Sequence, residues 1–238
     1  NYNDFEYETS FEAYIDGSCN GTQHLVALTR DEITAPHINL VPQKTVGDLY
    51  RYVGNHVWGE IWHQLDAYTK EEIGQAKDVI RAVYAMKSDL ELATDKGDKQ
   101  YLHELHKRYR TDRLADIKKA APVFWAQFDE PSQRRKIAKR GVMTLPYGGT
   151  PYGLGEQVLD DAPKHGIPAL RHLEKVWASY FGRLLHEDCR TSIARPMRLL
   201  GVFEAAGRMA DFEQKFLHWN VPVTNFPVVQ HYTEGIVK

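Results

Sequence analysis

The sequence predicts an α+β fold that is mostly helical. Apolar residues recur at helical spacing through the middle of the chain, whereas segments of strand composition lie near its two ends. Of the 238 residues, 42% are hydrophobic, which is enough for a sizeable core. We therefore expect one domain or two closely joined subdomains, in which strands from the two ends pair into one sheet that carries the helices as an insertion.

The first elements follow from residue composition. Residues 11–16 are rich in strand formers and predict a strand that ends at Asp16. Gly17 and Ser18 then turn the chain, and a helix is expected over 20–30. A loop bracketed by Pro36 and Pro42 precedes the next helix.

A long helix is predicted from Thr45 to Tyr68, because apolar side chains recur there every three or four residues. Thr69 followed by Glu72 resembles a capping box for another helix. The very polar segment 70–120 predicts a helical hairpin with its turn at 95–98.

The second half predicts a basic helix over 132–145, which Pro146 stops, and a Gly-rich stretch through Gly155. Two long helices are expected over about 168–187 and 191–217. The tail, 218–232, has the composition of a strand pair.

Charge and cysteine usage limit the functional classes. The formal net charge of −2 argues mildly against a simple DNA-coating protein, but it allows an enzyme with a local basic groove. Cys19 and Cys189 are too few for a disulfide framework, so a reducing, cytoplasmic location is expected. No apolar run approaches the roughly 18–20 residues of a membrane helix, and no membrane partner is predicted.

Asp16 is the first candidate for chemistry. A carboxylate at the end of an apolar strand can hold Mg²⁺, with the Gly17 carbonyl as a second oxygen ligand. The alternative is an ordinary turn or capping aspartate, which is the commoner role for this residue type. Cys19 and His24 also invite a nucleophile–base interpretation, which we disfavour because no orienting carboxylate lies at an obvious spacing.

The basic helix is the second candidate. Arg135 and Lys139 lie four residues apart and share a helix face, which suits a triphosphate. Tyr147 projects near the same side if the helix persists, and Gly148 and Gly149 permit a bend and a close backbone approach. The alternative is a solvated surface helix, to which we give equal weight on these residues alone.

Together these stretches resemble the single-subunit RNA polymerases of bacteriophage and mitochondrial type, and their residues are more similar to those of the phage branch. Asp-Gly-Ser-Cys-Asn-Gly-Thr-Gln-His at 16–24 resembles the family's first palm motif, and 135–148 resembles its fingers motif of form R-x-x-x-K-x7-Y-G. Weaker similarity follows at 175–179, at 218–219 and at 226–228. The similar stretches are spread over nearly the whole chain and occur in the same order as in the family.

The resemblance implies a right-hand polymerase fold and a set of roles. Residues 1–35 would be part of the palm, 36–217 the fingers with their nucleotide-binding helix at about 132–148, and 218–238 strands that return to the palm. The implied metal ligands are Asp16 and the Gly17 carbonyl, for two Mg²⁺ ions. The implied nucleotide-binding residues are Arg135, Lys139, Met143, Tyr147 and Gly148, of which Lys139 and Tyr147 join Asp16 as catalytic. The implied partners are a DNA template, an RNA transcript and ribonucleoside triphosphates.

A-family DNA polymerases share the fingers frame, so other positions distinguish RNA from DNA synthesis. The DNA enzymes carry a Glu five residues after the metal aspartate, where this chain has Gly21 and leaves room for a 2′-hydroxyl. They also carry an aromatic residue four positions after the helix lysine, where this chain has Met143. Both differences favour ribonucleotides.

Several features depart from the family pattern. The chain contains no second metal aspartate in the expected hairpin, so we expect these 238 residues to be inactive alone. A palm sheet that is incomplete in this chain would expose a strand edge, through which the chain would self-associate in a non-native way. Segment 70–120 is long for the family, and its His103 and His106 suggest a zinc site less strongly than a solvated helix face.

Three alternatives remain open from the residues themselves: a fragment of an A-family-like DNA polymerase, a non-catalytic nucleic-acid-binding module, and a helical scaffold whose charges face solvent. The binding module predicts salt-dependent binding that is indifferent to Mg²⁺ and to Asp16. The scaffold predicts no such binding.

Overall fold

The computed structural model describes residues 17, 19–168, 170, 172–213, 215–221 and 224–230. The predicted strand at 11–16 and its Asp16 therefore lie outside the described residues, as does the predicted pairing of strands from the two ends. Within the described part the chain is mostly helical with one two-stranded sheet, which confirms the predicted α+β class. None of the helices in these ranges is long and apolar enough to cross a membrane.

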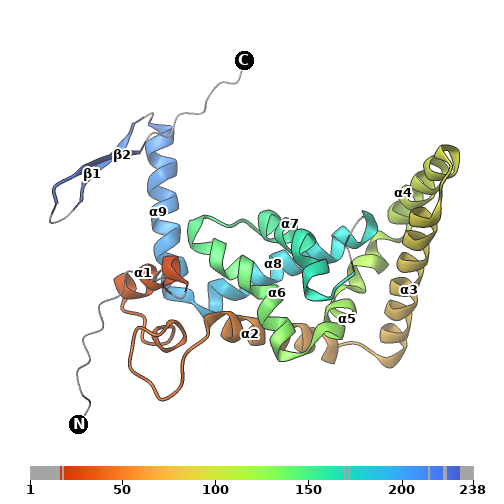
Figure 1. Cartoon of the computed structure of the whole chain (residues 1–238), viewed down its shortest axis with the longest axis horizontal. Helices are drawn as coiled ribbons and strands as arrows, with labels where there is room; N and C mark the ends of the chain where they lie inside the picture. Colours follow the sequence, from red (N-terminus) through yellow and green to blue (C-terminus); the bar gives the residue numbers. More distant parts are fainter. Residues whose placement is uncertain are drawn as a thin grey trace, which may run out of the picture.

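The molecule is a helical body with two projections (Figure 1). At one end α3 and α4 form a long hairpin, and at the other α9 leads to the strands β1 and β2. The body consists of α2 (Leu49–Asp66), α5 (Ala121–Trp125), α6 (Pro131–Thr144), α7 (Pro151–Asp161) and α8 (Lys175–Ser192). Helix α1 (Asn20–Thr29) packs beside α9 (Ala194–Phe212).

Helix α2 begins at Leu49 rather than at the predicted Thr45. Asp48 caps it, with its carboxylate accepting a hydrogen bond from the Arg51 amide at 3.1 Å. The preceding loop is closed by Asn39, whose side-chain oxygen accepts from the Gly47 amide at 2.7 Å. Val46, which fitted the apolar spacing, is 88% exposed in this loop.

The predicted capping box starts α3 (Lys70–Leu92). The Thr69 hydroxyl accepts from the Glu72 amide, and the Glu72 carboxylate accepts from the Thr69 amide. Helix α4 (Lys96–Lys119) returns along α3, so the helical hairpin is confirmed with its turn at 93–95.

Two helices of the second half differ from the prediction. The Gly-rich stretch contains the start of α7, because Thr150 caps it and Pro151 occupies its first turn. The glycines serve helix packing here: a Cβ on Gly182 of α8 would lie 2.6 Å from the Pro151 carbonyl oxygen of α7. Helix α8 starts at Lys175, later than predicted, after Gly166 turns the chain with φ +72°.

The remaining elements are short. The 3₁₀ turns are η1 (Ala35–Ile38), η2 (Ala126–Phe128), η3 (Leu145–Tyr147), η4 (Ala162–His165) and η5 (His172–Glu174). Strands β1 (Leu217–Asn220) and β2 (Pro227–Gln230) pair antiparallel, with Leu217 opposite Gln230, which confirms the predicted tail strands. Helix α9 ends at Phe212, five residues before the predicted boundary.

An aromatic cluster forms the centre of the core. Trp58, Phe124, Trp125, Trp177 and Phe181 are fully buried. The rings of Phe124 and Trp177 stack at 4.4 Å, and the Trp177 indole donates to the Ile117 carbonyl at 2.9 Å. These contacts connect α5 and α8 to the end of α4, and so fix the base of the hairpin to the body.

Candidate nucleotide-binding site

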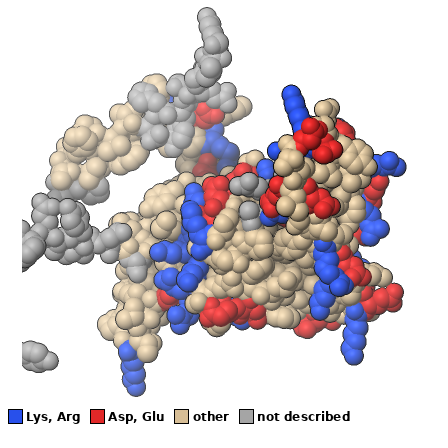
Figure 2. Space-filling view, turned by 45° about the vertical axis from the view of Figure 1, so that its right-hand side comes forward, with Lys and Arg blue, Asp and Glu red and all other residues tan. Residues whose placement is uncertain are grey.

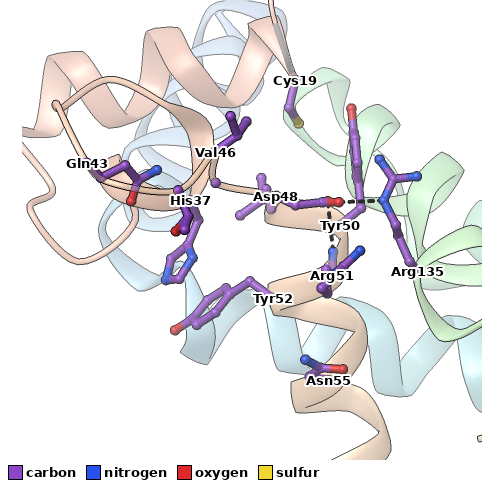
Figure 3. A pocket seen from close by; sticks show the side chains of 13 residues that line it. Cys19, His37, Gln43, Val46, Asp48, Tyr50, Arg51, Tyr52, Asn55 and Arg135 are labelled. Carbon is purple, nitrogen blue, oxygen red and sulfur yellow. Dashed lines mark hydrogen bonds and ion pairs between the residues drawn. The ribbon is translucent and has the colours of Figure 1, made fainter. Parts of the chain in front are cut away.

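Arg135 of α6 lines a cavity of about 650 Å³ that lies mainly between α2 and the loop before it. Figure 3 shows Arg135 and Asp48 pointing toward each other at its edge, with Tyr50 and Cys19 nearby. The His37 and Tyr52 rings stack at 3.8 Å along another wall. Burial lowers the pKa of His37, and neighbouring His56 lowers it further, so the neutral imidazole is favoured there.

Arg135 is oriented by a residue far away in the sequence. Its Nε donates to an Asp48 carboxylate oxygen at 2.5 Å. Burial opposes ionisation of Asp48, but the Arg135 guanidinium and the Arg51 amide outweigh it and lower the pKa of this carboxyl. Asp48 thus caps α2 and holds Arg135 at the same time.

Tyr50 brings the two predicted cations together. The Arg135 guanidinium carbon lies 5.4 Å and the Lys139 ammonium nitrogen 5.7 Å from the centre of its ring. Burial, with the Cys19 thiol, raises the pKa of Tyr50, so the phenol stays neutral. The predicted common face of Arg135 and Lys139 is therefore present in the structure.

Lys139 differs from Arg135 in its charge environment. In the described ranges no carboxylate lies within 4 Å of the Lys139 ammonium group, which is exposed. Arg135 supplies a fixed cation and Lys139 an accessible one. Their arrangement suits an anionic group that approaches from solvent.

Tyr147 reaches its neighbours by a route different from the one predicted. Helix α6 ends at Thr144, and Pro146 lies within the turn η3, so the helical spacing from Lys139 does not extend to Tyr147. Gly148 follows with φ +86°, which confirms the predicted bend. The Tyr147 side chain is 74% exposed, and Met143 is exposed on α6.

The turn η3 places Tyr147 against α1. A Cβ built on Gly21 would lie 3.0 Å from the Tyr147 hydroxyl oxygen and 3.0 Å from the Pro146 Cβ. Any side chain at position 21 would have to displace these atoms. The position of Tyr147 therefore depends on the absence of a side chain at Gly21.

Around the first motif, Gly17 is exposed just before α1, whereas Asp16 lies outside the described residues. Cys19 is buried with φ +61°, and its thiol donates to the Thr22 hydroxyl at 3.3 Å. His24 is exposed. The Cys19 thiol thus has a hydrogen-bond partner other than His24, which argues against the nucleophile–base hypothesis, as expected.

The preferred alternative for the histidines of α4 was partly wrong. His106 does not lie on a solvated face: it is buried between α4 and α3, where its Nε2 lies 2.9 Å from the Met86 carbonyl oxygen. No group of three or more His, Cys, Asp or Glu residues that could hold a metal occurs among the described residues.

Sequence reasoning missed Asp48 and Tyr50. Asp48 carried a signal, since an Asp just before an apolar helical pattern is a typical N-cap. Tyr50 was counted among the apolar positions of the helix, and no spacing rule connects it with a helix that begins 81 residues later.

Comparison with known proteins decides the family. The profile described as DNA-dependent RNA polymerase matches residues 1–237. The chain belongs to the DNA-dependent RNA polymerase family. The chain is 27% identical over 248 residues to the DNA-directed RNA polymerase of Enterobacteria phage T3 and 26% identical over 247 residues to the RNA polymerase of Escherichia phage T7.

These matches cover 98% and 97% of the chain but only 25% and 24% of the two phage proteins. The chain thus spans about a quarter of the length of these relatives. A mouse mitochondrial RNA polymerase is 43% identical over a shorter stretch of 61 residues, which is 26% of the chain and 5% of that protein.

Proposed function

We propose that this chain contributes the nucleotide-binding part of a phage-type RNA polymerase, which adds ribonucleotides to RNA on a DNA template. The observation that supports this most directly is the arrangement of Arg135 and Lys139 around the Tyr50 ring, beside an open cavity. Two cations on one helix face match the charge of a triphosphate.

Arg135 and Lys139 contribute to triphosphate binding in different ways. Asp48 and Tyr50 restrict the Arg135 side chain, so little side-chain entropy is lost when a phosphate oxygen binds. Lys139, which no described carboxylate neutralises, supplies most of the uncompensated charge. We expect its removal to weaken nucleotide binding more than the removal of any other exposed cation of α6.

Tyr147 and Gly21 are proposed to select the sugar. The Tyr147 hydroxyl lies against Gly21 of α1, where an added Cβ would come within 3.0 Å of it. A residue with a side chain at position 21 would therefore displace Tyr147. This arrangement supports the preference for ribonucleotides over deoxyribonucleotides.

Magnesium is proposed to bind Asp16 and the Gly17 carbonyl. The donor set is chemically suitable, because both groups are hard oxygen ligands and Gly17 is exposed at the start of α1. When bound, such ions activate the attacking hydroxyl and stabilise the leaving group. The protein's own contribution is to hold the triphosphate at Arg135 and Lys139 and the sugar at Tyr147.

The test is primer extension by the complete reading frame that contains this segment, with ribonucleotides and deoxyribonucleotides offered separately. Asp16→Ala should abolish ribonucleotide addition. Preference for deoxyribonucleotides in the unaltered protein would instead assign a DNA polymerase, and no extension with either would favour a binding module.

Lys139→Ala and Lys136→Ala form a matched pair on α6. Lys139→Ala should lower kcat/KM for ribonucleotides by roughly ten- to hundredfold, the value of a charge-assisted hydrogen bond. Lys136, exposed three residues earlier, should change it little. Equal effects of the two substitutions would refute the specific role of Lys139.

Tyr147→Phe removes one hydroxyl and should ease deoxyribonucleotide incorporation by the complete protein, with ribonucleotide addition largely retained. Unchanged sugar selectivity would count against Tyr147 as the selecting residue.

A further inference from the structure

A second basic cavity, of about 300 Å³, lies between α4 and α8. Arg110 and Lys118 enter it from α4, and Lys175 and Arg183 enter it from α8. On each helix the two cations are eight residues apart; on α8 that is about two turns, whereas α4 is kinked at Arg113 between its two cations. Two helices thus each contribute two cations to one opening.

The lining contains no carboxylate. Across the described ranges, none of these four cations has an Asp or Glu oxygen within 4 Å. Other cations of α4 do have such partners: Arg108 pairs with Asp112 at 3.8 Å and Arg113 with Asp116 at 2.7 Å. Helix α4 therefore offers carboxylates that can pair with its cations, but Arg110 and Lys118, which face α8, have no such partner in the described part of the chain.

The neutral groups of the cavity are hydrogen-bonding or apolar. The Tyr180 hydroxyl donates to the Gln64 side-chain oxygen at 2.8 Å, and burial raises the pKa of Tyr180, which therefore adds no negative charge. Ser179 supplies an exposed hydroxyl between Lys175 and Arg183. Four cations and a hydroxyl, with no competing anion, match phosphate oxygens.

The spacing of these cations favours a chain of phosphates over a single group. Eight residues of α8 span about 12 Å, and successive phosphates of one duplex strand rise by about 3.4 Å along the duplex axis. The Lys175–Arg183 pair therefore spans roughly three nucleotide steps of axial rise. A lone phosphate would leave most of these cations uncompensated.

This cavity is separate from the nucleotide-binding site. Asp48 lies at the start of α2 and Gln64, the partner of Tyr180, near its end, so the two sites are about 24 Å apart along that helix. One nucleoside triphosphate cannot reach both. On the face drawn in Figure 2, Lys and Arg lie in separate groups, interspersed with Asp and Glu, rather than in one continuous field.

We propose that the α4–α8 cavity binds the phosphodiester backbone of a nucleic acid, as a contact distinct from the α6 nucleotide site. The choice of nucleic acid over another polyanion rests on the proposed polymerase function. The grouping of the four cations around the cavity does not depend on that function.

The experiment measures binding of a fluorescent 20-nucleotide single strand, and of the corresponding duplex, to the 238-residue chain over a range of salt concentrations. Lys118→Ala combined with Arg183→Ala should reduce the slope of log K against log salt by about 1.4 for the single strand and 1.8 for the duplex. The control combines Arg81→Ala with Arg108→Ala, whose cations pair with Asp78 and Asp112. It removes the same charge and should leave the slope nearly unchanged.

Equal slopes for the cavity and control variants would overturn the proposal. So would inorganic tripolyphosphate binding that only the cavity variant loses while it keeps its affinity for nucleic acid, because the site would then hold a compact anion. Thermal unfolding checks that each variant folds, and Lys118→Gln with Arg183→Gln replaces the alanine pair if it does not.

The outcome is separable from the polymerase proposal. In a protein that already carries Lys139→Ala, the cavity substitutions should still lower the slope of log K against log salt and the control substitutions should not. This should hold even where Lys139→Ala impairs nucleotide addition. A lower slope in the cavity variant than in the control variant, with no nucleotide addition by the complete protein, would retain the nucleic-acid site and reject the polymerase function.

Discussion

Helices α6 and α4 are both rich in Lys and Arg, but the arginines of the two helices differ in where their partners come from. On α6, Arg135 pairs with Asp48 and lies over Tyr50, both from α2. On α4, Arg108 and Arg113 pair with carboxylates of their own helix, three or four residues away. Basic composition alone thus does not show how a cation is held; the partner of each side chain decides whether its own helix or another element orients it.

The largest expected effect tests how the α3–α4 hairpin is joined to the body that carries α6. Trp177→Ala should lower the free energy of unfolding by about 3–5 kcal/mol, because it removes a fully buried ring and leaves the Ile117 carbonyl without its donor. Urea denaturation measures the loss. Trp62→Ala, at a side chain 45% exposed, should cost less than about 1 kcal/mol; similar losses for both would contradict the proposed junction.

The next effect concerns a buried carboxyl of the body that, unlike Asp48, has no cationic partner among the described residues. Burial raises the pKa of Asp188 to about 7, helped by Glu60 and opposed by a hydrogen bond from Ser192. An unfolded Asp ionises near pH 4, so this group's contribution to stability is full below that pH and is lost as pH rises toward 7.

Asp188→Asn should therefore stabilise the protein at pH 8 by about 1–3 kcal/mol, and the gain should vanish near pH 4. Thermal or urea unfolding at several pH values provides the measurement. Burial also raises the pKa of Glu174 to about 7, so part of the pH dependence should persist in the variant. A gain that is the same at pH 4 and pH 8 would show that Asp188 is not protonated in the folded state.

A smaller effect separates the two roles of Asp48. Asp48→Asn keeps a good helix cap but removes the ion pair with Arg135, whereas Asp48→Ala removes both. The alanine variant should be less stable than the asparagine variant by about 1 kcal/mol. Both should weaken nucleotide binding by the complete protein; normal binding with asparagine would show that Arg135 needs no carboxylate to orient it.

The smallest effect contrasts a glycine of the hairpin with one of the body. Gly74→Ala on α3 should stabilise the protein by about 0.5–1 kcal/mol, because no other atom lies within 4 Å of the added Cβ. Gly182→Ala on α8 should destabilise it, since the backbone of α7 occupies that space. Thermal unfolding of the two variants gives the signs, and a stabilising effect at Gly182 would mean that α7 and α8 separate easily.

The sequence by itself determined the features that depend on neighbouring residues. The Thr69–Glu72 capping box, the end of α6 before Pro146 and the bend at Gly148 each follow from the conformational limits of one or a few adjacent residues. Family membership was also readable, because two long motifs lie in order along the chain.

Only the tertiary structure decided which of these residues meet. Asp48 reaches Arg135 across 87 positions, and Gly21 lies against Tyr147 through a turn that a helical extrapolation placed elsewhere. His106 was predicted on a solvated face, but the packing of α3 against α4 buries it. Local propensity acts over a turn of helix, whereas these contacts depend on how distant elements pack, which no short stretch of sequence encodes.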